Sequence, residues 1–163
     1  MKKFLILILL VVLALPLWAC SSIDKVEGIV EEQGYVGIDM EKSTEQSAMK
    51  EAVANTVRKD YAKIKGLSFS DENAKIFVWA ILPTNIMEMA NPNFAIIVEF
   101  SSRGALVNEL VQNAELGAIV ASIVGEGDIE ELVYQKGVAV DNCIIYAKGA
   151  KSSELYKTLR LNN

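Results

Sequence analysis

The first nineteen residues differ from the rest of the chain in their apolar character. Lys2 and Lys3 precede an uninterrupted apolar run over residues 4–15, and a short basic stretch followed by an apolar one is typical of a bacterial export signal. The apolar stretch from residue 4 to Ala19 is sixteen residues long, whereas a membrane-spanning helix needs about 20. We therefore expect residues 1–19 to be a signal peptide and exclude them from the folded domain.

The end of this segment carries a specific resemblance. Leu17, Trp18 and Ala19 precede Cys20, and together they resemble the lipobox of bacterial lipoproteins. The resemblance implies cleavage after Ala19, a lipid on Cys20 and a lasting membrane anchor; a soluble exported protein or an uncleaved anchor are the alternatives. Ser21 is not the aspartate that marks retention at the inner membrane. The resemblance therefore favours the outer membrane in a bacterium with two membranes, and otherwise the outer face of the cell membrane.

The remaining chain has the composition of a globular domain. Apart from Lys2 and Lys3 it holds 14 of the 16 Lys and Arg residues, against 21 Asp and Glu, and this acidic balance argues against nucleic acid as a partner. The chain has no histidine, which removes the commonest general base and most zinc sites. We expect no cofactor and no metal. If Cys20 carries lipid, Cys143 is the only other thiol, and we expect it to be buried and structural.

The first part of the exported chain is predicted to be short and extended. Residues 20–24 are too few for a long linker, so we expect a short tether and a single α+β domain over residues 25–163. Alternating apolar residues predict one or two strands over residues 25–39. Gly28 and Gly34 flank positions at which the chain could turn back.

The clearest predicted element is a long amphipathic helix over residues 44–65. Ser43 and Gln46 have the spacing at which a cap hydroxyl and a glutamine satisfy each other's backbone donors, and Gly66 supplies a stop. Apolar side chains recur at steps of three and four, as on a helix that lies on a core. These positions are Met49, Ala52, Val53, Val57, Tyr61 and Ile64.

Three further segments are rich in β-branched and aromatic residues. They cover residues 74–82, 94–100 and 138–147, and each is predicted to be a strand. Between the first two, residues 83–93 are bounded by prolines and are too long for a tight hairpin turn. We expect a loop or a single helical turn there.

The remaining segments predict short helices. One covers residues 106–114 and stops at Gly117, and residues 118–124 fit a buried strand or a helical continuation equally well. Asp128 and Glu131 form a capping pair for another. Two further signals are Gly137, which ends this helix, and Ser152 or Ser153, which opens a last one. The fold class is α+β: a small mixed or antiparallel sheet with one long amphipathic helix and two or three shorter helices packed on it.

The order of these elements carries a second resemblance. Glycines in the predicted strand pair, followed by a helix with Ala48 and Ala52 at four-residue spacing and by paired strands, resemble the small outer-membrane lipoproteins grouped with the amino-terminal domain of flagellar assembly protein T. The resemblance covers about residues 25–100. It implies a small non-catalytic envelope domain, and no functional residue is carried over from it.

Two motifs invite a catalytic or ligand-binding interpretation and are better explained as helix caps. The segment Gly125-Glu126-Gly127-Asp128 lacks the third glycine of a dinucleotide site and the ligand spacing of a calcium loop. Ser102 stands at a strand-to-helix turn, but no histidine could activate it. We therefore expect no enzyme. A catalytic site would require two of the following to meet in one cleft: Ser102, Lys75, Asp39 and Glu99.

The function expected from the sequence is a non-catalytic, membrane-anchored envelope lipoprotein. Its lipid on Cys20 would bind the membrane, and its domain would bind another envelope protein or a cell-wall component. The alternative is a periplasmic carrier of small ligands. Its apolar pocket would be lined by Trp79, Phe77, Met87 and Phe94.

Overall fold

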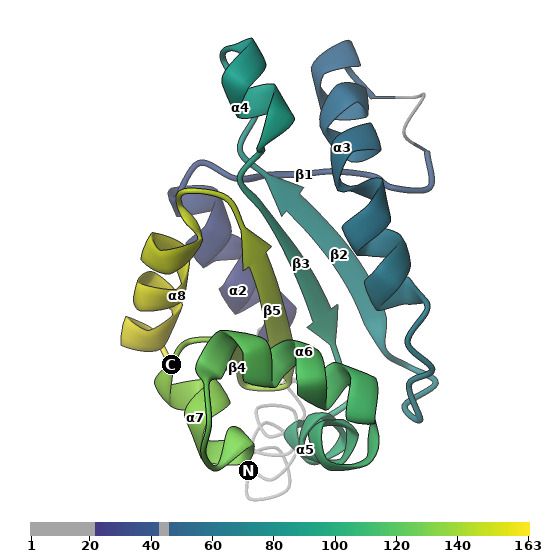
Figure 1. The fold of residues 1–163 in the computed structure, drawn as a ribbon, viewed down its shortest axis with the longest axis vertical. Helices are drawn as coiled ribbons and strands as arrows, with labels where there is room; N and C mark the ends of the chain where they lie inside the picture. The colour runs from purple at the N-terminus through teal and green to yellow at the C-terminus, as the bar shows by residue number, and fades with distance from the viewer. Residues whose placement is uncertain (1–21, 43–45) are drawn as a thin grey trace, which may run out of the picture.

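The chain folds around a five-stranded antiparallel sheet (Figure 1). The computed structural model describes residues 22–42 and 46–163. The strand order is β1-β2-β3-β5-β4, and every neighbouring pair is antiparallel. The α+β class is therefore confirmed. The strands are β1 (Val36–Gly37), β2 (Lys75–Ala80), β3 (Phe94–Glu99), β4 (Ala139–Val140) and β5 (Cys143–Lys148).

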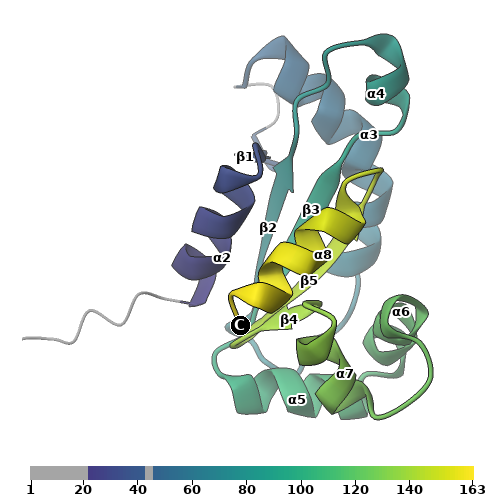
Figure 2. The same cartoon turned by 90° about the vertical axis from the view of Figure 1, so that its left-hand side faces the viewer.

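Helices cover both faces of this sheet (Figure 2). On one face lie α2 (Ser22–Glu32) and α8 (Ser152–Leu161). The other face is covered by α3 (Ala48–Lys65), α5 (Arg103–Gln112), α6 (Ala114–Val124) and α7 (Ile129–Gln135). The short helix α4 (Ile86–Ala90) lies beyond the end of β2 and β3. The described residues thus hold more helices than the sequence predicts.

The packing of the central strand β3 explains why its residues 94–98 are all apolar. Ile96 and Val98 pack under the helices of one face, and Ala95 and Ile97 pack under those of the other. Successive side chains of a strand point to opposite faces, so a strand covered on both faces contains no polar positions to alternate with. Both predicted strands, β2 and β3, and the predicted helical turn α4 are confirmed.

The prediction of strands over residues 25–39 is wrong for most of that segment. Residues 22–32 form α2, and only Val36–Gly37 is a strand. The buried side chains are Ile23, Val26, Ile29 and Val30, at the three- and four-residue steps of a helix. Residues 22–24, predicted to be tether, form the first turn of this helix, and Gly28 is exposed within it. Gly34 provides the turn into β1, with a φ of +83°.

The long helix α3 starts later than predicted. Its N-cap is Ser47, whose hydroxyl accepts a hydrogen bond from the Lys50 amide. The side chain of Gln46 is instead bound to the backbone of Asp39, accepting at 2.9 Å and donating at 2.7 Å. Gln46 therefore fixes the preceding loop rather than the helix, and Ser43 lies outside the described residues. The predicted end at Gly66 is confirmed.

A single asparagine separates α5 from α6. Asn113 ends α5, and its side chain accepts a hydrogen bond of 3.1 Å from the Leu116 amide to begin α6. Residues 118–124 are therefore helical, and the predicted stop at Gly117 is wrong because Gly117 lies inside α6. An N-cap satisfies backbone donors that a helix start leaves open, and here it outweighs the weak helix propensity of glycine.

The predicted strand over residues 138–147 is divided into β4 and β5. Asp141 and Asn142 form the two-residue turn between them, with Asp141 at a φ of +51°. The side chain amide of Asn142 donates to the carbonyl of Phe100, which ties the hairpin to the end of β3. The caps of α7 by Asp128 and of α5 by Ser102 are confirmed, as is the start of α8 at Ser152.

Candidate functional site

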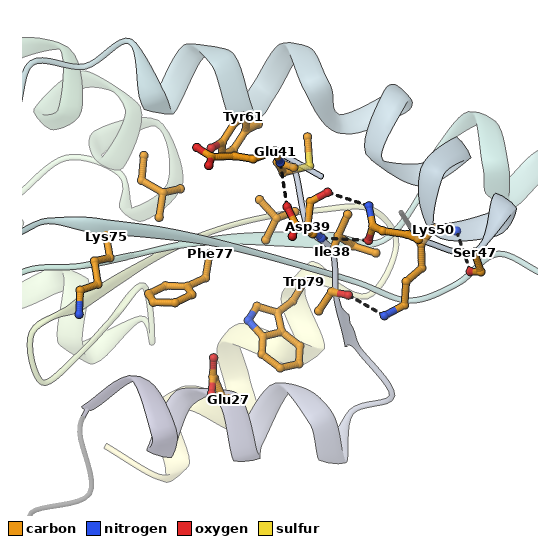
Figure 3. Close-up of a pocket in the computed structure, with 15 residues that line it drawn as sticks. Glu27, Ile38, Asp39, Glu41, Ser47, Lys50, Tyr61, Lys75, Phe77 and Trp79 are labelled. Atoms are coloured by element: carbon orange, nitrogen blue, oxygen red, sulfur yellow. Dashed lines mark hydrogen bonds between the residues drawn. The ribbon is translucent and has the colours of Figure 1, made fainter. Parts of the chain in front are cut away.

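A groove of about 910 Å³ lies along one edge of the sheet (Figure 3). Its floor is the outer edge of β2. Helix α2 lies on one side of this edge, and α3 lies on the other. The groove exists because β1 pairs with only the last residues of β2: Val36 pairs with Ala80, Gly37 pairs with Trp79, and the Ile38 amide donates to Val78 at 2.8 Å.

The wall on the α2 side combines aromatic and charged groups. Lys75, Phe77 and Trp79 point from β2 toward α2, and Glu27 points from α2 toward Phe77 and Trp79. Partial burial raises the pKa of the Glu27 carboxyl, and the neighbouring acids Asp24, Glu31 and Glu99 raise it further. This wall therefore carries a partly desolvated acid surrounded by other acids.

The wall on the α3 side includes a turn at residues 39–42 that is stabilised by side-chain hydrogen bonds. The Asp39 carboxylate accepts hydrogen bonds from the amides of Lys42 and Glu41, at 2.8 and 2.9 Å, and these bonds lower its pKa. Glu41 forms an ion pair of 3.0 Å with Lys65, and Tyr61 lies beside it in the groove. Asp39 and Glu41 therefore act as structural groups of the turn.

The apolar pocket predicted for a ligand carrier is not formed by the four residues proposed for it. Phe77 and Trp79 lie on the α2 side of the sheet, whereas Phe94 is buried on the opposite side. Met87 is 79% exposed on α4. Alternation along the strands separates these side chains, because Trp79 pairs with Ala95 and not with Phe94.

Of the residues considered for catalysis, Lys75 and Asp39 share the groove but lie on its opposite walls, with Lys75 pointing toward α2 and Asp39 held in the turn on the α3 side. Lys75 and Glu99 are neighbours across β2 and β3. Ser102 caps α5 with a hydrogen bond of 3.1 Å from the Ala105 amide and lines no part of the groove. Among the residues that the structure describes, no three acidic or thiol side chains gather as a metal site.

Cys143 is fully buried in β5, as the sequence predicts. Burial raises the pKa of its thiol to about 12, and Glu99, Asp141 and Glu27 raise it as well. Burial also raises the pKa of Tyr35 and of Tyr156 to about 12. These groups are therefore protonated in the folded protein over a pH range in which the unfolded chain releases their protons.

We expect the free energy of unfolding to fall as the pH rises from 9 toward 12. The unfolded Cys143 thiol titrates near 9.0 and the tyrosines near 10.0, so above these values the unfolded state binds fewer protons than the native state. Each such group contributes a slope of up to about 1.4 kcal/mol per pH unit. Urea unfolding between pH 7 and 11 measures this, and in Cys143→Ala the fall should begin nearer pH 10. Identical profiles for the two proteins would contradict the assignment to Cys143.

Comparisons with protein-family models, curated proteins and solved structures return no match for this chain. Within residues 22–42 and 46–163, no helix has the length and apolar character needed to cross a bilayer. Ala19 and Cys20, the predicted cleavage and lipidation positions, lie outside the described residues. The resemblance to the flagellar assembly protein T group stays a prediction, and the glycine-bearing strand pair with which it began is helix α2 followed by the short strand β1.

Sequence reasoning did not find the groove. Its distinctive residues, Glu27, Lys50 and Phe77, come from α2, α3 and β2, and no local spacing joins them. The one available signal was the helical spacing of Ile23, Val26 and Ile29, which would have placed Glu27 on a helix beside the sheet.

Proposed function

We propose that this chain is a non-catalytic lipoprotein of the bacterial envelope, anchored by lipid on Cys20. The observation that carries the proposal is the order of Lys2 and Lys3, the apolar run over residues 4–15, and Leu17 to Cys20. An export signal with this ending resembles the processing site at which a cysteine becomes the lipid-bearing first residue. The domain is proposed to be an interaction or structural module that binds an envelope protein or a cell-wall component.

The position of α2 supports this proposal. The helix begins at Ser22, two residues after Cys20, so a lipid on Cys20 would hold the domain close to the membrane surface. A single acyl chain gives only reversible binding at about 0.8 kcal/mol per CH₂ group, and a second chain makes anchoring stable. A diacylated cysteine would therefore be a lasting anchor. In a bacterium with two membranes, Ser21 favours the outer membrane as the destination.

The decisive experiment is metabolic labelling with a fatty-acid analogue. We expect the parent chain to incorporate the label, and Cys20→Ala to lose it completely and to accumulate as an uncleaved precursor, because no thiol remains at the attachment position. The matched control is Cys143→Ala, which removes the other cysteine and should keep full labelling. Label retained on Cys20→Ala, or absent from the parent, would overturn the proposal.

A small-ligand carrier is the alternative, and the groove is the observation relevant to it. The groove is open along its length and combines Phe77 and Trp79 with the charged groups Glu27, Lys75 and Asp39. Pockets for small apolar ligands enclose most of the ligand surface and carry few polar groups. The groove therefore suits an extended polar chain better than a small apolar ligand, and this favours the interaction role.

A further inference from the structure

A side chain covers the free edge of each of the two outer strands of this sheet. On β1, the outward carbonyl of Gly37 accepts a hydrogen bond of 2.9 Å from the Lys50 ammonium. On β4, the carbonyl of Ala139 accepts one of 3.0 Å from the side chain amide of Asn163. Proteins commonly cover such groups because an open edge can pair with another chain. Both short outer strands are thus capped by side chains.

The edge of β2 beyond β1 has no such cap. The carbonyl of Val78 points toward β1, since it accepts from the Ile38 amide. In an antiparallel ladder the N–H and C=O groups of every second residue point the same way, so those of Ile76 point into the groove. Among the described residues, neither group has a hydrogen-bond partner on that side. The chain leaves the sheet after Ile38 and turns toward α3 (Figure 3), which leaves the edge of Ile76 open.

The walls of the groove define the side chains that would fit there. A residue paired with Ile76 would point to the α3 side, toward Tyr61, whereas its neighbour paired with Phe77 would point to the α2 side. On the α2 side, Glu27 is partly buried, and other acids lie near it. A basic side chain at the position opposite Phe77 would complement this charge, and an apolar one suits the position opposite Ile76.

We propose that the open edge of β2 binds an extended peptide segment of a partner protein as an added antiparallel strand, with a basic side chain facing Glu27 and an apolar one facing Tyr61. The inference rests on the proposed interaction role and names the kind of partner. Backbone hydrogen bonds to the N–H and C=O groups of Ile76 would hold the added strand, and the residues of the two groove walls would select its side chains. In the N-to-C direction the recognised order is basic, apolar, polar, because the added strand runs opposite to β2.

The test uses the full chain purified in detergent and a fluorescein-labelled peptide, Ac-Lys-Val-Thr-Val-Thr. Its first valine should pair with Ile76 and its lysine should face Glu27. We expect a dissociation constant on the order of 100 µM by fluorescence anisotropy and slower hydrogen exchange at Ile76. Replacing the peptide lysine with glutamate should weaken binding at least about fivefold. No saturable binding of the lysine peptide would overturn the proposal.

One pair of modified peptides and one pair of protein variants distinguish strand addition from non-specific electrostatic binding. N-methylation of the first valine removes the donor to the Ile76 carbonyl and should weaken binding about tenfold, whereas N-methylation of the next threonine, whose N–H points away, should not. Glu27→Lys should reverse the preference between lysine and glutamate peptides. Glu31→Lys, on an exposed part of α2 outside the groove, should not reverse it.

The proposal would be overturned if the two N-methylations weakened peptide binding equally. It would also be overturned if Glu27→Lys and Glu31→Lys changed the preference between the two peptides equally. Self-pairing of β2 between two copies would overturn it as well, and would appear as a dimer in sedimentation that the lysine peptide does not dissociate. The fatty-acid label on Cys20 is read independently of these measurements. Loss of peptide binding with labelling intact would therefore remove this inference and leave the lipoprotein assignment in place.

Discussion

Gly137→Ala should destabilise the domain by about 4 kcal/mol or prevent its folding. Gly137 has a φ of +73°, which alone costs a side-chain-bearing residue roughly 1–2 kcal/mol. A β-carbon at this position would also overlap the carbonyl oxygen of Tyr156 and lie 2.8 Å from the Arg160 nitrogen. Both are backbone atoms of α8, so relief requires moving a whole helix away from the sheet. Effects this large are exceptional for single substitutions and have a specific steric cause.

The matched control for this substitution is Gly34→Ala. Gly34 also has a positive φ, +83°, but a β-carbon there would meet no atom within 4 Å. We expect it to cost only about 1–2 kcal/mol, the conformational part alone. Urea unfolding followed by circular dichroism measures both. Similar losses for the two variants would show that the packing of α8 on Gly137 is not the cause.

Glu109→Ala should cost about 2–4 kcal/mol of stability. Glu109 lies on α5 and is 2% exposed. One of its carboxylate oxygens accepts hydrogen bonds from the amide of Ser70, the hydroxyl of Ser70 and, at 3.2 Å, the amide of Asp71. Removing the carboxylate leaves these donors without their acceptor, and hydrogen bonds to charged groups contribute about 1.5–3 kcal/mol each, not additively.

This prediction is checked by urea unfolding and by amide exchange of Ser70 and Asp71. We expect faster exchange at these two amides in Glu109→Ala, because the carboxylate fixes the loop between α3 and β2. Glu109→Gln retains one oxygen as an acceptor and should lose less. Glu72→Ala, an exposed acid of the same loop, should change stability by no more than about 0.5 kcal/mol. Equal losses for Glu109→Ala and Glu72→Ala would contradict the assigned role.

The parts of the fold that the sequence predicted correctly depend on local signals. Strands β2 and β3 follow from runs of β-branched and aromatic residues, which lose little freedom in an extended chain. Ser102 and Asp128 were recognised as caps because a cap acts on amides two or three residues away. In each case the deciding interactions lie within a few residues.

Local signals failed where the spacing of apolar residues in one segment fitted both a strand and a helix. With Ile23 assigned to the tether, the positions of Val26, Ile29 and Val30 fit two short strands as well as they fit a helix. The helix is decided by burial, since all four residues pack against the sheet beside Tyr35 and Trp79. Gly117 likewise reads as a stop in the sequence, yet it lies inside α6 because Asn113 begins that helix four residues earlier.

By itself the sequence determined the α+β class, the strands β2 and β3, the helix caps Ser102 and Asp128, and the acidic, histidine-free composition. Only the tertiary structure decided that helices cover both faces of the sheet and that β1 leaves β2 after Ile38. The groove depends on that departure and on Glu27, Lys50 and Phe77, which meet from three separate elements. Contacts between residues far apart in the chain are fixed by the packing of whole elements, and no short-range pattern in the sequence records them.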